Sequence, residues 1–254
     1  MSLAASALAY GYPAREIGRD IELALQAGEV MALLGPNGHG KTTLLKTMLG
    51  LLPARGGSLR LDGQVLESLG AGARARALGY VPQAHAGTFA FSVVEMVLMG
   101  RTAHAGLFAA PSAHDRTVAR AMLERLGIAA LAERPYTEIS GGERQLALVA
   151  RALAQERRFI ILDEPTASLD FGNQGKVMAQ IRRLAAEGLG VLFTTHDPNQ
   201  ALRYADRVML LRDGRALASG PAAALLTQDN LVALYGSAVE IVRDADGRLA
   251  FLPG

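Results

Sequence analysis

The stretch Val30-Met31-Ala32-Leu33-Leu34-Gly35-Pro36-Asn37-Gly38-His39-Gly40-Lys41-Thr42 decides the fold of this 254-residue chain. Its opening apolar run predicts a strand covered on both faces, as in a parallel sheet. Residues 35–42 then match the pattern G-x-x-x-x-G-K-[ST], whose glycines let backbone N–H groups turn toward phosphate oxygens. A helix is expected next, because apolar residues recur at helical spacing from Leu44 to Leu51. Strand, glycine loop and helix in this order predict a phosphate-binding site.

The same alternation continues along the chain. A half-buried strand is expected at 20–25, where Ile21, Leu23 and Leu25 share one face. Further strands are expected at 58–62, 79–82, 159–162 and 191–193, and hairpins at 208–219 and around 246–247. Helices are expected at 93–98, 115–127, 143–154 and 173–187. The pattern predicts a parallel sheet with covering helices and a helical insertion, and functional residues beyond the carboxyl ends of the strands.

Two acids follow one of these apolar strands, in Phe159-Ile160-Ile161-Leu162-Asp163-Glu164. Next to a phosphate-binding loop, Asp163 is expected to hold Mg²⁺, through water, and Glu164 to act as general base or to orient water. Taken alone, such a pair would be interpreted as a helix N-cap.

Residues 139–145, Ile-Ser-Gly-Gly-Glu-Arg-Gln, open a predicted helix. A serine and two glycines at a helix start leave backbone N–H groups free to bind an anion. A plain N-cap explains the same residues equally well, so this motif has meaning only beside the other two.

Composition excludes several classes of protein. The chain has no cysteine, so disulfides, thiolate zinc sites and cysteine nucleophiles are absent from its chemistry. The net charge is +2, no tryptophan is present and no run of five like charges occurs, so nucleic acid is not an expected partner. No apolar stretch approaches 18 residues, and the first basic residue is Arg15, so neither a membrane span nor a signal peptide is expected.

With these three motifs the chain resembles the ATP-binding subunits of ABC transporters over nearly its whole length. The resemblance extends to Gln83, to the segment Ser168-Leu169-Asp170 and to His196. It implies an α/β fold: a phosphate-loop NTPase core with a mainly parallel sheet, an antiparallel β subdomain and an inserted helical subdomain. It also implies one cassette spanning 1–254, with a catalytic core at 1–86 and 157–254 and the helical subdomain at 87–156.

The resemblance also assigns roles to residues of this chain. ATP and Mg²⁺ are the implied cofactors. The implied ATP-binding residues are Tyr12, Gly35, Pro36, Asn37, Gly38, His39, Gly40, Lys41, Thr42 and Thr43. The implied catalytic residues are Glu164, His196, Gln83 and Lys41, and the metal-binding residues are Thr42, Gln83 and Asp163.

Two of these assignments leave alternatives. Tyr12 is placed to stack on adenine, but the neighbouring Tyr10 is a rival for that role. His39 is bulky for the loop, and its side chain is expected to point to solvent, the alternative being a contact with nucleotide or with a dimer partner.

The family works as a head-to-tail dimer, in which one copy completes the ATP site of the other. Here Ser140, Gly141, Gly142, Glu143 and Asp170 are the residues implied to reach the partner's ATP. Glu143 departs from the commonest form of this motif and places a negative charge near nucleotide.

Softer signals favour one type of transporter. The segments at 92–104, 114–128, 145–156 and 195–201 resemble those of importers for iron chelates, haem, cobalamin and molybdate. Such a subunit is expected on the cytoplasmic face of the cell membrane, bound to integral membrane permease subunits and served indirectly by a solute-binding protein. A docking surface for the permease is expected at 84–110, with some of Phe89, Phe91, Leu107 and Phe108 lining a groove for a cytoplasmic helix of the permease; the alternative is that these side chains pack inward.

Three alternatives remain. The first is a subunit of the same family that serves another solute or an exporter. The second is a soluble ABC ATPase acting on DNA or ribosomes, which needs tandem cassettes or a coiled-coil insertion. The third is a phosphate-loop kinase, which has no need of the motif at 139–145.

Overall fold

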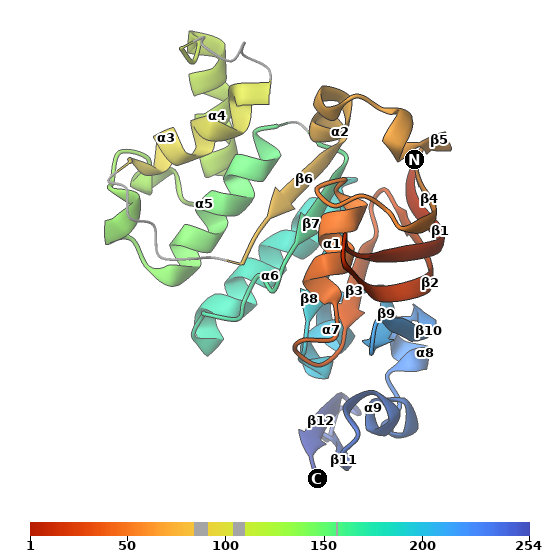
Figure 1. Cartoon of the computed structure of the whole chain (residues 1–254). Coiled ribbons are helices and arrows are strands. Elements are labelled where there is room, and N and C mark those ends of the chain that lie inside the picture. The colour runs from red at the N-terminus through yellow and green to blue at the C-terminus, as the bar shows by residue number, and fades with distance from the viewer. Residues whose placement is uncertain (84–90, 104–109, 156) are drawn as a thin grey trace. The chain divides into compact units, whose positions relative to one another are not determined.

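The computed structural model describes residues 1–83, 91–103, 110–155 and 157–254 (Figure 1). The chain forms two compact units, which are treated separately below. The first unit comprises Met1–Ser68 and Leu192–Gly254, and the second comprises Leu69–Val191.

An antiparallel sheet begins the first unit. Its strands are β1 (Ser2–Tyr12), β2 (Arg15–Gln26), β4 (Gly56–Leu61) and β5 (Gln64–Val65), in the order β2-β1-β4-β5. Ile21, Leu23 and Leu25 of β2 are buried on one face, as their alternation predicts. The antiparallel β subdomain is therefore present.

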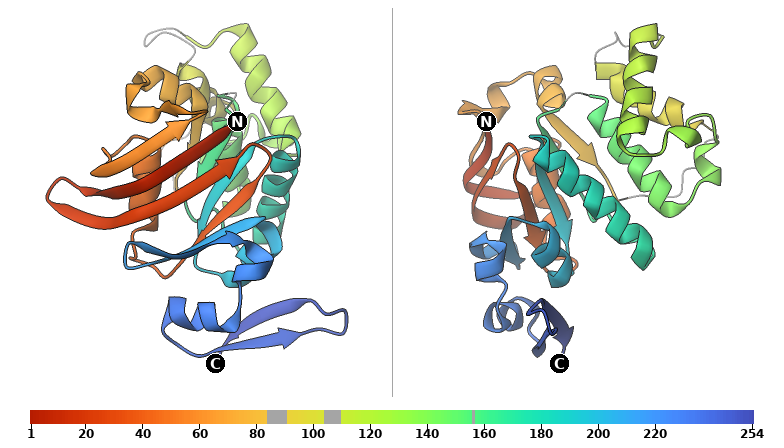
Figure 2. Two further views of the ribbon diagram at one scale, coloured as in Figure 1. Left: turned by 90° about the vertical axis from the view of Figure 1, so that its right-hand side faces the viewer. Right: turned by 180° about the vertical axis from the view of Figure 1, so that it is seen from behind.

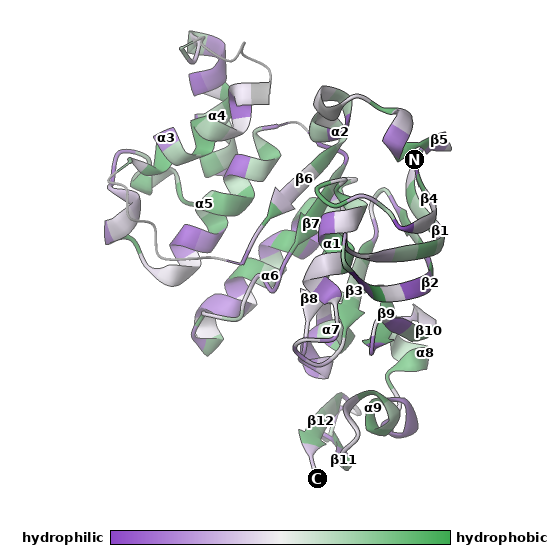
Figure 3. Cartoon of the chain, viewed as in Figure 1, coloured by the Kyte–Doolittle hydropathy of each residue, from purple (hydrophilic) through white to green (hydrophobic). Residues whose placement is uncertain are grey.

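A second sheet of this unit contains the strand before the glycine loop. This strand, β3 (Val30–Leu34), is buried at every residue and is green along its length in Figure 3. It pairs in parallel with β9 (Arg207–Arg212), which pairs antiparallel with β10 (Arg215–Pro221); β8 (Gly190–Thr195) lies on the other side of β3. Parallel pairing with both faces covered explains the continuous apolar run.

Helices follow the strands of the first unit. They are α1 (Lys41–Met48), α7 (Pro198–Tyr204), α8 (Ala222–Leu225) and α9 (Gln228–Tyr235), with a 3₁₀ turn η1 at Leu66–Ser68. The chain then forms the hairpin of β11 (Val239–Arg243) and β12 (Leu249–Pro253), as the turn around Asp246 predicts. Helix α1 stops before Leu51, contrary to expectation, because Gly50 adopts a left-handed φ of 69° that ends the helix, and Leu51 is 62% exposed.

The second unit contains two parallel strands, β6 (Leu78–Val81) and β7 (Phe159–Leu162), paired residue for residue. Its helices are α2 (Ala71–Ala77), α3 (Val93–Leu98), α4 (Ala113–Arg125), α5 (Gly141–Leu153) and α6 (Phe171–Ala186), with 3₁₀ turns η2 (Met99–Ala103), η3 (Ala129–Leu131) and η4 (Tyr136–Glu138). The four helices predicted from apolar spacing are therefore confirmed with small shifts of their ends. The α/β class is confirmed by the parallel pairing in both units.

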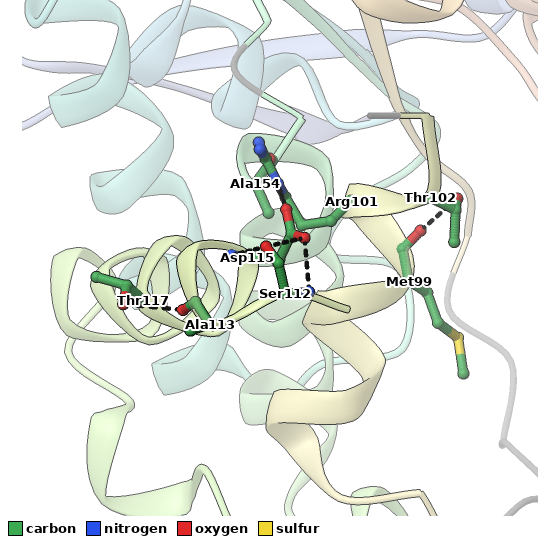
Figure 4. Close-up of polar contacts among 8 residues, drawn as sticks. All are labelled: Met99, Arg101, Thr102, Ser112, Ala113, Asp115, Thr117 and Ala154. Atoms are coloured by element: carbon green, nitrogen blue, oxygen red, sulfur yellow. Dashed lines mark hydrogen bonds and ion pairs between the residues drawn. The ribbon is translucent and has the colours of Figure 1, made fainter. Parts of the chain in front are cut away.

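A buried ion pair joins helices of the second unit (Figure 4). Arg101, only 5% exposed, donates from Nε to Oδ1 of Asp115 at 2.9 Å and from Nη1 to the carbonyl oxygen of Ala154 at 2.7 Å. Ser112 caps α4 and hydrogen-bonds the same carboxylate through its hydroxyl and its N–H. These bonds from Ser112 and Arg101 hold the pKa of Asp115 well below its usual range.

The predicted helical subdomain at 87–156 stays a prediction, because the units divide the chain elsewhere and residue 87 lies outside the described residues. Between 91 and 155 the described elements are helices and 3₁₀ turns. Among the residues that the structure describes, no helix has the length and hydropathy needed to cross a membrane.

Candidate active site

The glycine loop connects β3 to α1 and is held by close backbone contacts. The N–H of Gly35 donates to the carbonyl of Thr195 at 3.3 Å, and a Cβ at Gly35 would lie 2.1 Å from the carbonyl oxygen of Leu211. Gly40 has a left-handed φ of 95°, and a Cβ there would lie 2.9 Å from the hydroxyl of Tyr10. Only glycine fits these positions, and α1 has no side-chain cap at its start. The loop therefore offers backbone N–H groups to an anion.

Lys41 lies beneath the loop and is 5% exposed. Its Nζ donates to the carbonyl oxygens of Gly35 at 2.7 Å and Pro36 at 3.0 Å, and to Oδ1 of Asn37 at 3.4 Å. The loop itself thus satisfies the ammonium group, which can exchange these neutral acceptors for phosphate oxygens. Thr42 is exposed beside it, whereas Thr43 is buried.

The two candidate tyrosines differ in exposure. Tyr10 is fully buried under the loop, and burial raises its pKa well above the usual range. Tyr12, at the end of β1, is 45% exposed. Of the two rings, only that of Tyr12 is accessible to a planar ligand.

His39 does not simply point to solvent. Its side chain is 28% exposed, and its Nδ1 accepts a hydrogen bond from the N–H of Asp213 at 3.1 Å. Asp213 lies in the turn between β9 and β10 with a left-handed φ of 51°. The local sequence around His39 carries no signal of this contact.

His196 follows β8 in the first unit. The buried Thr194 and Thr195 end this strand, and His196 itself is exposed. Asp197 caps α7 by accepting from the N–H of Asn199 at 2.8 Å. The hydroxyl of Tyr235 donates to the carbonyl oxygen of His196 at 2.8 Å.

In the second unit the predicted acids follow β7. Asp163 is buried, and its N–H donates to the carbonyl of Val81 at 2.9 Å. Glu164 is half-buried and has a left-handed φ of 44°, which is rare for a residue with a side chain. Burial and the negative charge of Asp163 raise the pKa of Tyr80 on β6 to about 12. Gln83 is exposed two residues beyond β6, so it follows the carboxyl end of the strand adjacent to β7.

Ser140 caps α5 with a reciprocal pair of hydrogen bonds. Its hydroxyl accepts from the N–H of Glu143 at 3.3 Å, and the Glu143 carboxylate accepts from the N–H of Ser140 at 2.8 Å. Hydrogen bonding of the carboxylate to the backbone and to the side chain of Ser140 lowers the pKa of Glu143. The unusual acid of this motif is therefore turned back on its own helix, and the spacing Ser-x-x-Glu is a signal from which the capping box could have been predicted.

Asn173 joins this motif to the start of α6. A Cβ at Gly142 would lie 2.8 Å from Cβ of Asn173. Asn173 also donates from its N–H and its side-chain amide to Asp170, at 2.9 and 2.7 Å, and these bonds lower the pKa of that carboxyl. Glycine at 142 therefore permits close packing of α5 on α6, a role that the motif alone does not reveal.

The predicted residues are distributed over both units. The loop residues, Tyr12 and His196 belong to the first unit, and Gln83, Asp163, Glu164, the 139–145 motif and Asp170 belong to the second. Within the described residues, no cluster of three or more acidic or histidine side chains could hold a metal ion alone. In nucleotide sites Mg²⁺ is usually bound by one or two carboxylates together with the phosphates of the substrate, so such a cluster is not required. In the predicted docking surface, 84–90 and 104–109 lie outside the described residues, and Phe91 is 39% exposed.

Residues 19–167, more than half of the sequence, match the ABC transporter family. This chain belongs to the ABC transporter family. Members of this kind bind ATP and hydrolyse it to power transport, so this ABC subunit is an ATPase.

Relatives and a solved structure match most or all of the chain. The molybdate import ATP-binding protein MolC of Haemophilus influenzae is 41% identical over 83% of this chain and 78% of its own. The hemin import ATP-binding protein HmuV of Gloeobacter violaceus is 41% identical over 88% of this chain and 83% of its own. A structure described as an inward-facing metal-chelate type ABC transporter aligns over 100% of this chain and 97% of that chain, with a TM-score of 0.87 and 35% identity.

Proposed function

We propose that this ABC ATPase powers the import of a metal chelate or a related solute, of the haem or molybdate type, through a separate membrane permease. The alignment over the full length of a metal-chelate type transporter subunit carries the proposal. Relatives that import hemin and molybdate support it. The subunit then works at the cytoplasmic face of the cell membrane, served indirectly by a solute-binding protein. An ATPase for another solute or for an exporter is the alternative.

The first unit is proposed to bind the nucleotide. Tyr12 stacks on adenine, because its ring is the exposed one of the two candidates. The loop amides surround the phosphates, Lys41 leaves the carbonyls of the loop for phosphate oxygens, and the exposed Thr42 hydroxyl is a ligand for Mg²⁺.

The second unit is proposed to supply the groups that act on water. The carboxylate of Asp163, through water, and the amide of Gln83 would hold Mg²⁺, which would neutralise charge on the phosphates. Glu164 accepts a proton from the attacking water at its carboxylate. Its left-handed backbone supports this role, since strained conformations of this kind gather at functional sites. His196 is proposed to contact the terminal phosphate.

Two copies are proposed to assemble head to tail. Ser140, Gly141, Gly142, Glu143 and Asp170 of one copy then meet the ATP held by the other. In the capping box, the N–H groups of Ser140 and Glu143 are bonded within the motif, so Gly141 and Gly142 are the residues whose amides are offered to phosphate. The same box holds the Glu143 carboxylate against the Ser140 amide, so this carboxylate is bonded within its own helix.

Uptake by living cells tests the proposed solute class. A strain in which the native chain is replaced by Glu164→Gln is expected to lose uptake of one labelled solute among haem, a ferric chelate and molybdate. The wild-type chain restores that uptake. If the variant strain still takes up all three solutes but loses uptake of a different one, the alternative of an ATPase for another solute would be favoured.

Cross-linking tests the permease contact separately. Single cysteines are introduced into this cysteine-free chain at Phe91 and Ala110, and at Val242 of β11 as a control. Cross-links to a membrane protein are expected from Phe91 and Ala110. Cross-links from Val242 alone would contradict the proposed docking surface.

A further inference from the structure

The C-terminal part of the chain is bound directly to the segment that carries His196. We define the C-terminal module as α9 together with the hairpin β11–β12, which lie side by side at the blue end of the chain in Figure 2. The module has its own buried residues, namely Leu231, Leu234, Val239 and Phe251. It is therefore a packed element rather than a loose tail.

Tyr235, the last residue of α9, makes the first connection. Its hydroxyl donates to the carbonyl oxygen of His196 at 2.8 Å. Burial, with a further contribution from the charge of Asp197, raises the pKa of Tyr235 well above its usual range. The phenol therefore stays protonated and acts as a hydrogen-bond donor at any physiological pH.

Asn199, in the first turn of α7, makes the second connection. Its Nδ2 donates to the carbonyl oxygen of Phe251 at 3.0 Å, and its Oδ1 accepts from the N–H of Phe251 at 2.7 Å. One amide thus satisfies both backbone groups of a residue in β12. This two-point bond fixes α7 against the module in distance and in orientation.

His196 is held from both sides as a result. On its N-terminal side, Thr195 accepts from the N–H of Asp197 at 3.1 Å through its hydroxyl and belongs to the buried strand β8. On its C-terminal side, Asn199 ties α7 to β12, and Tyr235 binds the carbonyl of His196 itself. The backbone that carries the imidazole is therefore hydrogen-bonded to the end of β8 on one side and to the C-terminal module on the other.

We propose that Tyr235 and Asn199 are positioning residues for ATP hydrolysis, through which the C-terminal module holds His196 in place. This inference rests on the role proposed above for His196. Loss of either contact leaves the nucleotide-binding loop unchanged, but the imidazole of His196 is then held less firmly in position to contact the terminal phosphate. The chemical step then slows, whereas nucleotide affinity stays the same.

The test is the kinetics of Tyr235→Phe, which removes a single oxygen. Its kcat is expected to fall about threefold to tenfold with KM for ATP unchanged, while Tm falls only by the small amount that the loss of one hydrogen bond explains. Asn199→Ala should give the same kinetic pattern, with a larger fall in Tm because it removes two hydrogen bonds to Phe251. Tyr204→Phe is the matched control, since it removes a hydroxyl from the end of neighbouring α7, and it should leave both constants unchanged.

A double variant separates positioning from a general structural role. With His196→Ala already present, Tyr235→Phe should have no further effect on the single-turnover rate, because it acts only through His196. The inference would be overturned if Tyr235→Phe slowed the His196→Ala variant by the same factor as it slows the wild type. A raised KM for ATP with a normal kcat in Tyr235→Phe would also overturn it. Normal kcat in both Tyr235→Phe and Asn199→Ala, beside a slow His196→Ala, would also overturn it and leave the proposed function intact. Full activity of His196→Ala would instead refute the proposed role of His196.

Discussion

The Nδ1 atom of His39 lies 3.0 Å from Oδ1 of Asp213 and accepts a hydrogen bond from the Asp213 N–H. These residues are 174 positions apart in the chain. The contact ties the tip of the phosphate-binding loop to the β9–β10 turn, where Gly214 packs so closely on β2 that a Cβ would lie 1.9 Å from the carbonyl oxygen of Ile17. The loop is therefore braced by a hairpin that contributes no residue of the glycine motif.

Removing the hydrogen bond between His39 and Asp213 is expected to weaken nucleotide binding without unfolding the protein. His39→Ala should raise the Kd for ATP about threefold to tenfold, because one hydrogen bond that orders the loop is lost. Fluorescence titration with a labelled nucleotide measures it. Asp213→Asn is the matched control at pH 8, since it keeps the backbone donor; an equal loss in that variant would show that the carboxylate, rather than the N–H, supports the loop.

Lys41→Ala removes the charge beneath the loop. ATP should bind about tenfold to a hundredfold more weakly, as expected when charge-assisted hydrogen bonds to phosphate are lost, and hydrolysis should fall with it. Lys46→Ala, on the same helix, provides the control and should bind ATP normally. Undiminished Mg-ATP hydrolysis by Lys41→Ala would contradict the assignment of the loop.

Glu164→Gln keeps the shape of the side chain but cannot accept a proton. ATP binding should persist while turnover falls on the order of 10²- to 10⁴-fold, the usual worth of a positioned base. Unhydrolysed ATP should then hold two copies together, so size-exclusion chromatography with Mg-ATP should show a dimer that disappears without nucleotide. A protein that stays monomeric in saturating Mg-ATP would count against the head-to-tail assembly.

Mixing two inactive chains tests whether Ser140 acts in trans. Lys41→Ala disables the loop of its own copy, and Ser140→Arg blocks the motif that faces the partner's ATP. In the heterodimer one site carries both lesions and the other carries none, so hydrolysis should partly recover in the mixture. Failure to recover, despite isolated heterodimer, would favour action within one copy or strict coupling of the two sites.

The buried pair of Arg101 and Asp115 predicts a pH dependence of stability. Because the folded-state pKa of Asp115 is depressed, its stabilising effect is present above the unfolded pKa of about 4 and is lost as pH falls toward the folded value. The difference in Tm between wild type and Asp115→Asn should therefore be largest above pH 5 and shrink below pH 4. A difference that stays constant with pH would show that the ionised carboxylate is not responsible.

Local patterns were sufficient for much of the fold. The unbroken apolar runs at β3 and β7 predict strands buried on both faces, because only parallel strands covered on both sides need apolar residues at every position. Helices α5 and α6 follow from apolar residues at helical spacing, and the turn residues Asp213-Gly214 predict their hairpin. The motif at 35–42 lies between the end of β3 and the start of α1, and the motif at 139–145 lies at the start of α5, as their sequences predict.

Only the tertiary structure decided the contacts that support these motifs. Tyr10 and Tyr12 are two residues apart, so a regular strand would place both on the same face. The register of β1 shifts between Tyr10 and Gly11, and in the structure Tyr10 is buried under the loop while Tyr12 is exposed. The bonds of His39 with Asp213 and of Tyr235 with His196 join residues 174 and 39 positions apart. Motifs are local because their chemistry needs neighbouring backbone amides, whereas their supports come from whichever distant segments the packed core brings alongside, and that choice is made by the fold as a whole.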